Sequence, residues 1–311
     1  MAANPNAPLS AHELRDAVRH GYAYDIGRLD RVLCTDETQG LLEVQAGTRW
    51  AAIARHMRPE DQAAAQLGDA LPRVGTSVAW NAAGPDGRPA VAHVESLTLV
   101  TPDGELRRAS RTSNADLFAL AVGGQDLFGP LYSVTLRIES LSRALAEAAT
   151  AQVEGTQPGD ATRRLQLLVP PESLVAFLDD LRAACDDWRI RVARRELRET
   201  RHESETFLPW ARRSYVQASL WLAVPQALGG AVRLAQACGE LIDRCMAHGG
   251  SFSIAQTLDA SREQVEACYP GIRSFLAEKR RVDPSEKMVN GWYRHYRGLL
   301  GRQRCESRWN N

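Results

Sequence analysis

The sequence lacks three features that would each point to a class of protein. It has no net charge, because 38 basic residues balance 38 acidic ones, so bulk electrostatics favour neither a nucleic acid nor a membrane surface as partner. No window approaches the ~20 apolar residues of a membrane-spanning helix. Residues 1–8 carry neither a secretory nor a transit pattern. We therefore expect a cytoplasmic protein with no membrane span.

Clustered cysteines are also missing. No CxxC pair occurs, and no cysteine lies near histidine at metal-ligand spacing, so the sequence predicts no metal site. We expect all six thiols to be reduced and buried. They are Cys34, Cys185, Cys238, Cys245, Cys268 and Cys305.

The 311 residues suffice for two domains, and their patterning predicts an α+β fold. Ser10 and Glu13 form a capping box that predicts a helix over 11–20. A strand that leads to a turn is expected over 24–33, and a second strand over 40–47. Farther along, helices are expected over 49–57, 171–188, 227–250 and 261–282, and strands over 93–100, 105–110, 134–141, 163–170, 189–201, 214–225 and 249–258. Pro102-Asp103-Gly104 predicts a hairpin turn.

An ordered set of motifs lies between Glu43 and Ile138. It reads VQAGTRW, VGTSVAWNAAG, HVESLTLVTPDGEL, NADLFALAVGGQDLFG and PLYSVTLRI. In this order and spacing the motifs resemble the second half of the flavin-binding domain of FAD-linked oxidases of the vanillyl-alcohol oxidase and p-cresol methylhydroxylase (PCMH) type. FLPWARRSYVQASLWL, MAHGGSFS and GWYRHYRG resemble later parts of the branch that includes aldonolactone and alditol oxidases and decaprenylphosphoryl-ribose oxidase.

The resemblance implies a two-domain PCMH-type fold and an FAD-linked oxidoreductase. Residues 1–145 would form a flavin-binding-type domain without the N-terminal pyrophosphate loop. Residues 146–282 would form a substrate domain of an antiparallel sheet and helices, and 283–311 a tail returning to the flavin domain. The substrate would be a sugar-like or polyol small molecule, oxidised at a carbinol.

By the same resemblance, a set of mostly small residues would contact FAD. Alanine stands at positions 82 and 83, where many members carry histidine, so the FAD would be held non-covalently. The expected contacts are Gly75, Thr76, Ser77, Asn81, Gly84, His93 and Gly124.

Three departures point away from a bound flavin. No glycine precedes Gly21, although the family holds the pyrophosphate on a glycine-rich loop. Gly75-Thr76 replaces the usual pair of glycines, which adds a Cβ where backbone meets phosphate. The segment Gln256 to Leu258 offers no base or cation for the substrate.

Glu196 and Arg198 are the expected catalytic residues. They are two apart on a predicted strand, so they face the same side as Arg194. The resemblance assigns Glu196 as base or orienting group and Arg198 to stabilise an anion or the flavin; the alternative is a solvated face of paired charges. His93 and His295 are further candidates. Arginine pairs such as Arg194-Arg195 would hold a phosphorylated ligand only if the fold gathers several of them.

Two other functions stay open. A flavin-free homologue could use the interdomain cleft for binding or for non-redox cyclisation or isomerisation, and a non-catalytic chain could pair with an intact oxidase or with a second copy. In either case we expect Trp292, Tyr293 and Tyr296 to pack the tail onto the flavin domain.

Overall fold

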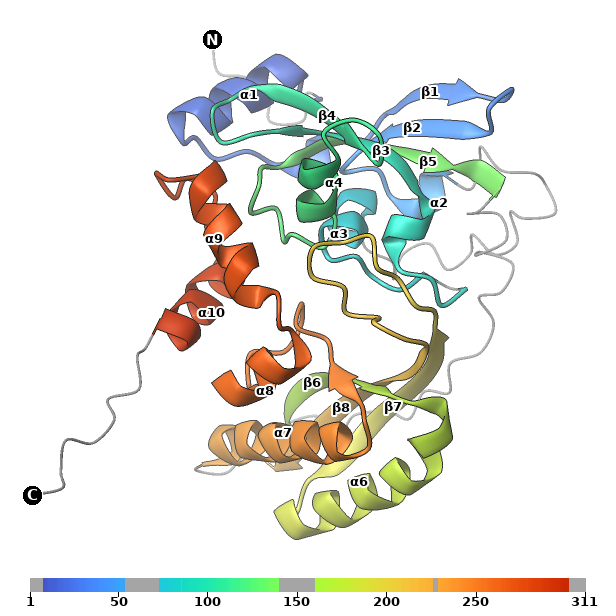
Figure 1. Ribbon diagram of the computed structural model, residues 1–311, viewed down its shortest axis with the longest axis vertical. Coiled ribbons are helices and arrows are strands. Elements are labelled where there is room, and N and C mark those ends of the chain that lie inside the picture. The colour runs from blue at the N-terminus through green and yellow to red at the C-terminus, as the bar shows by residue number, and fades with distance from the viewer. Residues whose placement is uncertain (1–7, 54–72, 85, 140–159, 226–228, 302–311) are drawn as a thin grey trace, which may run out of the picture.

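Two open antiparallel sheets organise the chain (Figure 1). The structure, a computed structural model, describes residues 8–53, 73–84, 86–139, 160–225 and 229–301. The first sheet has the order β1 (Val32–Asp36), β2 (Leu41–Gln45), β5 (Leu131–Arg137), β3 (Val94–Val100), β4 (Leu106–Ser110). The second has the order β7 (Arg191–Thr200), β8 (Tyr215–Pro225), β6 (Asp160–Val169), β9 (Ser251–Phe252). The predicted α+β fold class is confirmed.

Helix α1 (Ala11–His20) is confirmed with its bounds and its capping box. Its buried residues Leu14 and Val18 join a small apolar cluster with Val100 of β3. Arg15 donates from Nε to the Gly104 carbonyl at 3.0 Å, in the β3–β4 turn that was predicted as a hairpin. This helix therefore lies against the β3–β4 hairpin.

Short helices cover the first sheet: α2 (Trp50–Ile53), α3 (Val74–Ala79) and α4 (Ala115–Ala121). Val74 and Val78 of α3 are buried, as is Phe118 of α4. These helices put residues 73–84 and 114–126 next to each other, because the Gly123 N–H donates to the Val78 carbonyl at 2.9 Å.

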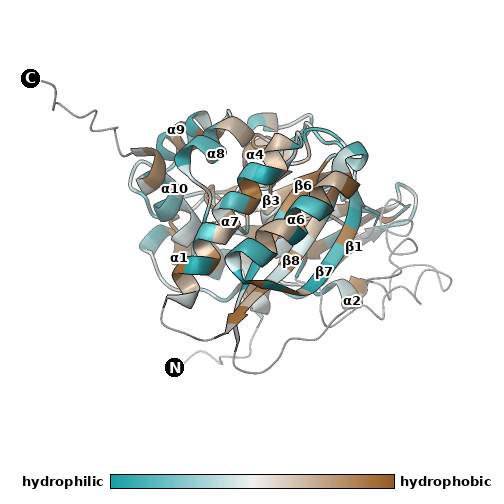
Figure 2. Ribbon diagram, turned by 90° about the horizontal axis from the view of Figure 1, so that it is seen from below, coloured by the Kyte–Doolittle hydropathy of each residue, from teal (hydrophilic) through white to brown (hydrophobic). Residues whose placement is uncertain are grey.

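One face of the second sheet is covered by α6 (Leu174–Trp188) and α7 (Gly230–Ala247), which lie side by side across it (Figure 2). Buried leucines of β6 and β8, such as Leu165 and its partner Leu220, belong to the same apolar core as these helices. The opposite face, which carries polar residues such as Gln166, Glu196 and Ser219, turns toward the first sheet (Figure 1).

Three further helices complete the described chain: α8 (Arg262–Cys268), α9 (Ile272–Val282) and α10 (Gly291–Gly301). Phe275 of α9 contacts Phe128 edge to face, with ring centroids 5.3 Å apart. A single core of buried apolar residues runs from the first sheet through α9 and α10 to the second sheet. No described helix has the length and apolar character that crossing a membrane requires.

Some local predictions were wrong. In residues 24–33 the turn comes before the strand instead of after it: a 3₁₀ turn (Ile26–Arg28) forms because the Asp25 carboxylate accepts the Gly27 N–H, and β1 begins only at Val32. Only residues 251–252 of the expected strand 249–258 pair as β9, since the Ile254 N–H donates to the Tyr269 hydroxyl instead. The helix expected over 49–57 is described only as α2, and residues 54–57 lie outside the described ranges.

The thiol prediction was also partly wrong. All five described cysteines are free, and four of them are buried, but Cys34 is exposed on β1. It lies on the edge strand of the first sheet, where one side has no neighbouring strand to cover it. Cys305 lies outside the described residues.

Candidate functional site

The polar face of the second sheet is a grid of directly paired residues. One row across β7, β8 and β6 is Arg194, Trp221 and Arg164. The next row is Glu196, Ser219 and Gln166, and the third is Arg198, Gln217 and Leu168. Residues that pair directly across antiparallel strands share a face, so the strand register alone brings these side chains together.

Hydrogen bonds and stacking order this grid. The Gln166 and Gln217 amides both donate to the Ser219 hydroxyl, at 3.1 and 3.2 Å. The guanidinium carbons of Arg164 and Arg194 lie 5.0 and 4.4 Å from the centroid of the Trp221 ring. Such cation–π contacts hold long side chains in place.

Charge on the grid is unbalanced. Glu196 pairs with Arg194. Burial lowers the pKa of Arg164, the Glu196 carboxylate raises it, and the charges of Arg194 and Arg198 lower it again, with a net decrease. An arginine stays protonated through such a shift. Three guanidinium groups therefore share one carboxylate on this face.

Arg198 connects the grid to the loop that contains Gly84. Its guanidinium donates to the Gly84 carbonyl at 3.4 Å. A Cβ on Gly84 would lie 3.0 Å from Asp86 Oδ1 and 3.2 Å from His93 Nε2, so only glycine fits comfortably here. The grid and the predicted residues Gly84 and His93 thus meet at one place.

Asp86 and His93 form a buried pair beside Gly84. His93 Nε2 lies 3.4 Å from Asp86 Oδ1, and both side chains are almost fully enclosed. Burial would raise the pKa of Asp86, but the hydrogen bond from His93, the Arg88 N–H and the charges of both residues lower it overall. Asp86 is therefore held as a carboxylate that orients the imidazole.

Asn81 joins the two sheets instead of lying open to a ligand. It is buried, its Oδ1 accepts the Val91 N–H at 2.9 Å, and its Nδ2 donates to Glu203 Oε1 at 3.2 Å. Its carbonyl accepts the Trp210 indole N–H at 2.8 Å. Burial raises the pKa of Glu203, although hydrogen bonds from Thr206 and the Glu205 N–H oppose the shift.

The predicted contacts on α3 are divided between protein and solvent. A Cβ on Gly75 would lie 2.7 Å from the Ala46 Cβ, so the glycine accommodates strand β2 and its end. Ser77 accepts the Trp50 indole N–H at 3.0 Å. Thr76 is half-buried, and its hydroxyl forms no hydrogen bond within the described parts of the chain.

The loop after α4 carries Gly124 and an acidic residue that sequence reasoning missed. A Cβ on Gly124 would lie 2.0 Å from the Leu120 carbonyl oxygen, so this glycine is required by the fold. Asp126 follows in a left-handed conformation, with φ of 58°. Its side chain keeps access to solvent, yet surrounding protein raises its pKa to about 6. Burial and the charge of Asp126 raise the pKa of Tyr24 to about 12.

A flavin fits these residues in part. Gly75, Ser77, Asn81 and Gly124 are committed to contacts within the protein. Thr76 and Arg198 keep accessible surface, and His93 lies buried beside Gly84, so these three are the predicted residues that could still contact a flavin. Over the described ranges, no group of three or more His, Cys, Asp or Glu side chains could hold a metal ion.

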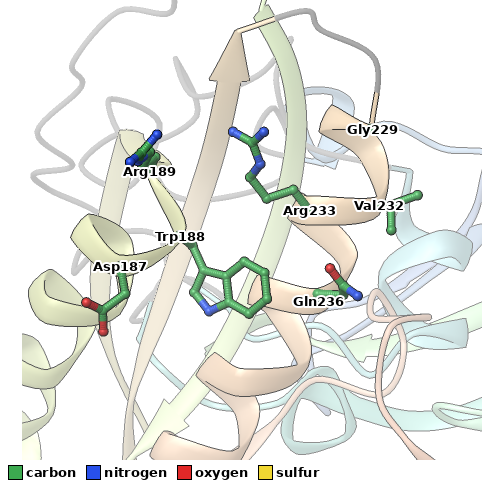
Figure 3. Close-up of a pocket in the computed structure, with 7 residues that line it drawn as sticks. All are labelled: Asp187, Trp188, Arg189, Gly229, Val232, Arg233 and Gln236. Carbon is green, nitrogen blue, oxygen red and sulfur yellow. The ribbon is translucent and has the colours of Figure 1, made fainter.

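Two pockets are formed by described residues. One, of about 360 Å³, lies between residues 88–92 and 201–205, and Glu203, the partner of Asn81, lines it. The other, of about 470 Å³, lies between the end of α6 and the start of α7, where Arg189 and Arg233 point across it from opposite sides of Trp188 (Figure 3). None of the predicted site residues lines the second pocket.

The tail does not bring His295 to the grid. His295 stacks edge to face on Tyr296, its Nε2 is buried without a hydrogen-bond partner in the described structure, and burial lowers its pKa. Trp292 donates to the Ile254 carbonyl at 2.8 Å, and Tyr296 to that of Thr257. These aromatic residues pack on segment 254–257 and on Phe275, so the expectation that they cover the flavin domain was wrong.

Residues 287–290 are the part of the tail that contacts the first sheet's loops. Lys287 donates to the Pro102 carbonyl at 3.2 Å, and Asn290 donates to the Gln125 carbonyl at 2.8 Å. Of the grid residues, only those on β7 were predicted, and the residues on β6 and β8 were not. Their alternation with leucines on β6 and β8 is the sequence signal that could have found them. Once the strand register is known, this alternation places them on the polar face.

Comparison with known proteins identifies the fold. Residues 10–110 match the FAD binding domain family. An FAD-linked oxidoreductase, ffsJ, of Aspergillus flavipes is 42% identical over 80 residues, which are 24% of this chain and only 13% of that relative. A chitooligosaccharide oxidase structure aligns with a TM-score of 0.63 and 13% identity, over 91% of this chain and 90% of that one. At this identity the alignment establishes the shared fold.

Proposed function

We propose that this chain belongs to the PCMH-type FAD-binding oxidase superfamily and is an FAD-linked oxidoreductase, which oxidises a carbinol of a sugar-like or polyol molecule on the polar face of the second sheet. The chitooligosaccharide oxidase with the same fold is named for a carbohydrate, which supports this substrate class. We further propose residues 1–145 as the flavin-type domain, 146–282 as the substrate domain and 283–311 as the tail.

One observation carries the proposal. Arg198 of the polar grid reaches the Gly84 carbonyl, and Gly84 lies within the segment that matches the FAD binding domain family. The candidate catalytic face and the candidate cofactor segment are thereby in direct contact. When bound, FAD would supply the acceptor for a hydride from the carbinol carbon.

The chain's own residues would bind the substrate and move its proton. Glu196, which is paired with Arg194, accepts the proton of the substrate hydroxyl. Arg198 stabilises negative charge on the substrate oxygen or on the reduced cofactor. Thr76 would contact the cofactor with its free hydroxyl, and His93, held by Asp86, would lie beside it.

A flavin-free homologue is the second candidate, supported by a specific observation. Four predicted cofactor residues, Gly75, Ser77, Asn81 and Gly124, already serve contacts within the protein. Asp126 adds an acidic group in the loop that carries Gly124. In this case the polar face binds a small molecule without redox chemistry.

The absorption spectrum of the purified protein separates the two. A flavin band, or quenching of FAD fluorescence on titration with protein, is expected for the oxidoreductase. A colourless protein that leaves FAD fluorescence unchanged overturns it and leaves the flavin-free alternative.

Replacement of the proposed catalytic residues tests the site itself. In flavin-loaded protein, Glu196→Gln is expected to slow cofactor reduction about 100-fold or more, within the range for loss of a general base. Arg195→Gln is the matched control, because Arg195 is exposed and lies on the opposite side of the same strand. Equal rates for Glu196→Gln and the control would show that the assigned site is wrong.

A further inference from the structure

We infer that the row Arg194–Trp221–Arg164 is a subsite for an oxyanion, so that the small molecule bound on this face carries a phosphate or carboxylate group. The inference extends the proposed function. The description of the bound molecule as a substrate rests on that proposed function. Binding of the anion itself needs only the arginine side chains of the second sheet.

The first argument is charge. Among the described residues Arg164 forms no ion pair, Arg198 makes only its bond to the Gly84 carbonyl, and Glu196 is already paired with Arg194. Three guanidinium groups and one carboxylate leave two positive charges on a single sheet face. Like charges held close together destabilise one another, and a bound anion relieves that repulsion.

The second argument is an unused donor. Arg194 Nε is buried and has no hydrogen-bond partner in the described structure. A buried N–H without a partner costs roughly as much as a lost hydrogen bond, so a retained one marks a place where a ligand atom is missing. An oxyanion supplies the acceptor that Nε lacks.

The third argument is spacing. Both guanidinium carbons stack within 5.0 Å of the same Trp221 ring centroid, which places them at most about 10 Å apart. Two guanidinium groups held beside one ring can both donate charge-assisted hydrogen bonds, of about 2.7–2.9 Å, to a single phosphate or carboxylate. The indole also prevents the two side chains from collapsing onto the protein, and it offers an apolar surface for a sugar ring.

A solvated pair of arginines is the competing explanation. Arg195, on the same strand, shows what that looks like: it is exposed, it makes no stacking contact, and it faces away from the grid. Arg164 and Arg194 differ from it because both stack on the Trp221 ring, and because the Nε of Arg194 is buried. These differences favour a ligand site over a solvated face.

Calorimetric titration of the full chain at low ionic strength tests the inference, with inorganic phosphate, glucose 6-phosphate, gluconate and uncharged glucose as probes. Binding of at least one anionic probe is expected, with glucose 6-phosphate tighter than glucose by tenfold or more. Tighter binding of the phosphorylated probe assigns a phosphate, and tighter binding of gluconate a carboxylate. Absence of binding by all anionic probes overturns the inference.

Two variants and a control locate the binding. Arg164→Gln and Arg194→Gln are each expected to weaken anion binding at least tenfold, while Arg195→Gln leaves it unchanged. Equal weakening by all three would reveal a nonspecific charge effect and overturn the subsite.

Thermal unfolding of each variant shows whether it is folded. Arg164→Lys, which keeps the charge but loses the forked geometry, gives a second measure if Arg164→Gln is unstable. Flavin content is measured on the same samples, so loss of the proposed redox function is distinguishable from loss of the anion site.

Discussion

Replacement of Asn81 by alanine separates a structural role from a cofactor contact. Removing the amide leaves the buried Val91 N–H without its acceptor, at a cost of about 1–3 kcal/mol, and takes one donor from the buried Glu203 carboxylate, at about 1 kcal/mol. Asn81 also has a left-handed φ of 46°, which alanine adopts at a cost of about 1 kcal/mol. We expect the free energy of unfolding to fall by about 3–5 kcal/mol.

The measurement is urea unfolding followed by circular dichroism, on protein freed of any flavin. Thr76→Val is the matched control, because its hydroxyl has no partner within the described residues. That variant should keep its stability within about 0.5 kcal/mol while FAD affinity falls. If Asn81→Ala costs less than about 1 kcal/mol without flavin but abolishes FAD binding, then Asn81 is a cofactor residue and the structural reasoning is refuted.

Other parts of the chain give further predictions. Asp126 has a pKa raised to about 6, so its contribution to stability is present below about pH 4 and is lost as pH rises through 6. In thermal unfolding scans, Asp126→Asn should therefore flatten the dependence of the unfolding temperature on pH. Lys279 and backbone N–H groups lower the pKa of Asp283, although burial opposes the shift. The contribution of Asp283 to stability therefore disappears as the pH falls below the usual pKa range of an aspartate. Lys279→Met should remove this dependence and cost about 3–5 kcal/mol, because a buried carboxylate is left unpaired; a cost under 1 kcal/mol would contradict the burial of the pair. Gly87→Ala should prevent the second sheet from packing on the segment that contains Gly87, since the new Cβ would lie 2.2 Å from the Glu199 carbonyl oxygen, and Gly87 has a φ of +73°. Normal yield of the variant with unchanged unfolding would disprove this contact.

Local signals predicted the elements that depend on neighbouring residues. The capping box at Ser10 and Glu13 gave both ends of α1 correctly, since the cap and the following glycine act within one turn. The alternation on β7 correctly placed Arg194 and Glu196 on one face, where they form an ion pair. The same rule failed at 24–33, where a single Asp25 side chain closes a turn within an alternating sequence.

Long-range contacts could not be read from the sequence. Arg164 joins Arg194 only because β8 lies between β6 and β7, an order that no local pattern states. Asn81 meets Glu203 across 122 positions of the chain, so its prediction as a cofactor contact could not include that competing partner. Asp86 stood in a segment with no recognisable motif, and its role follows only from the position of His93.

The uninterrupted apolar core has a consequence for how this protein can change. Because buried residues connect the first sheet to the second through Phe128, Phe275 and Trp292, the two halves cannot be exchanged as independent modules without opening a shared interior. New ligand preferences are accessible at Arg164 and Arg198, which are exposed on the polar face. The shared interior therefore confines such substitutions to a few exposed positions on one sheet face.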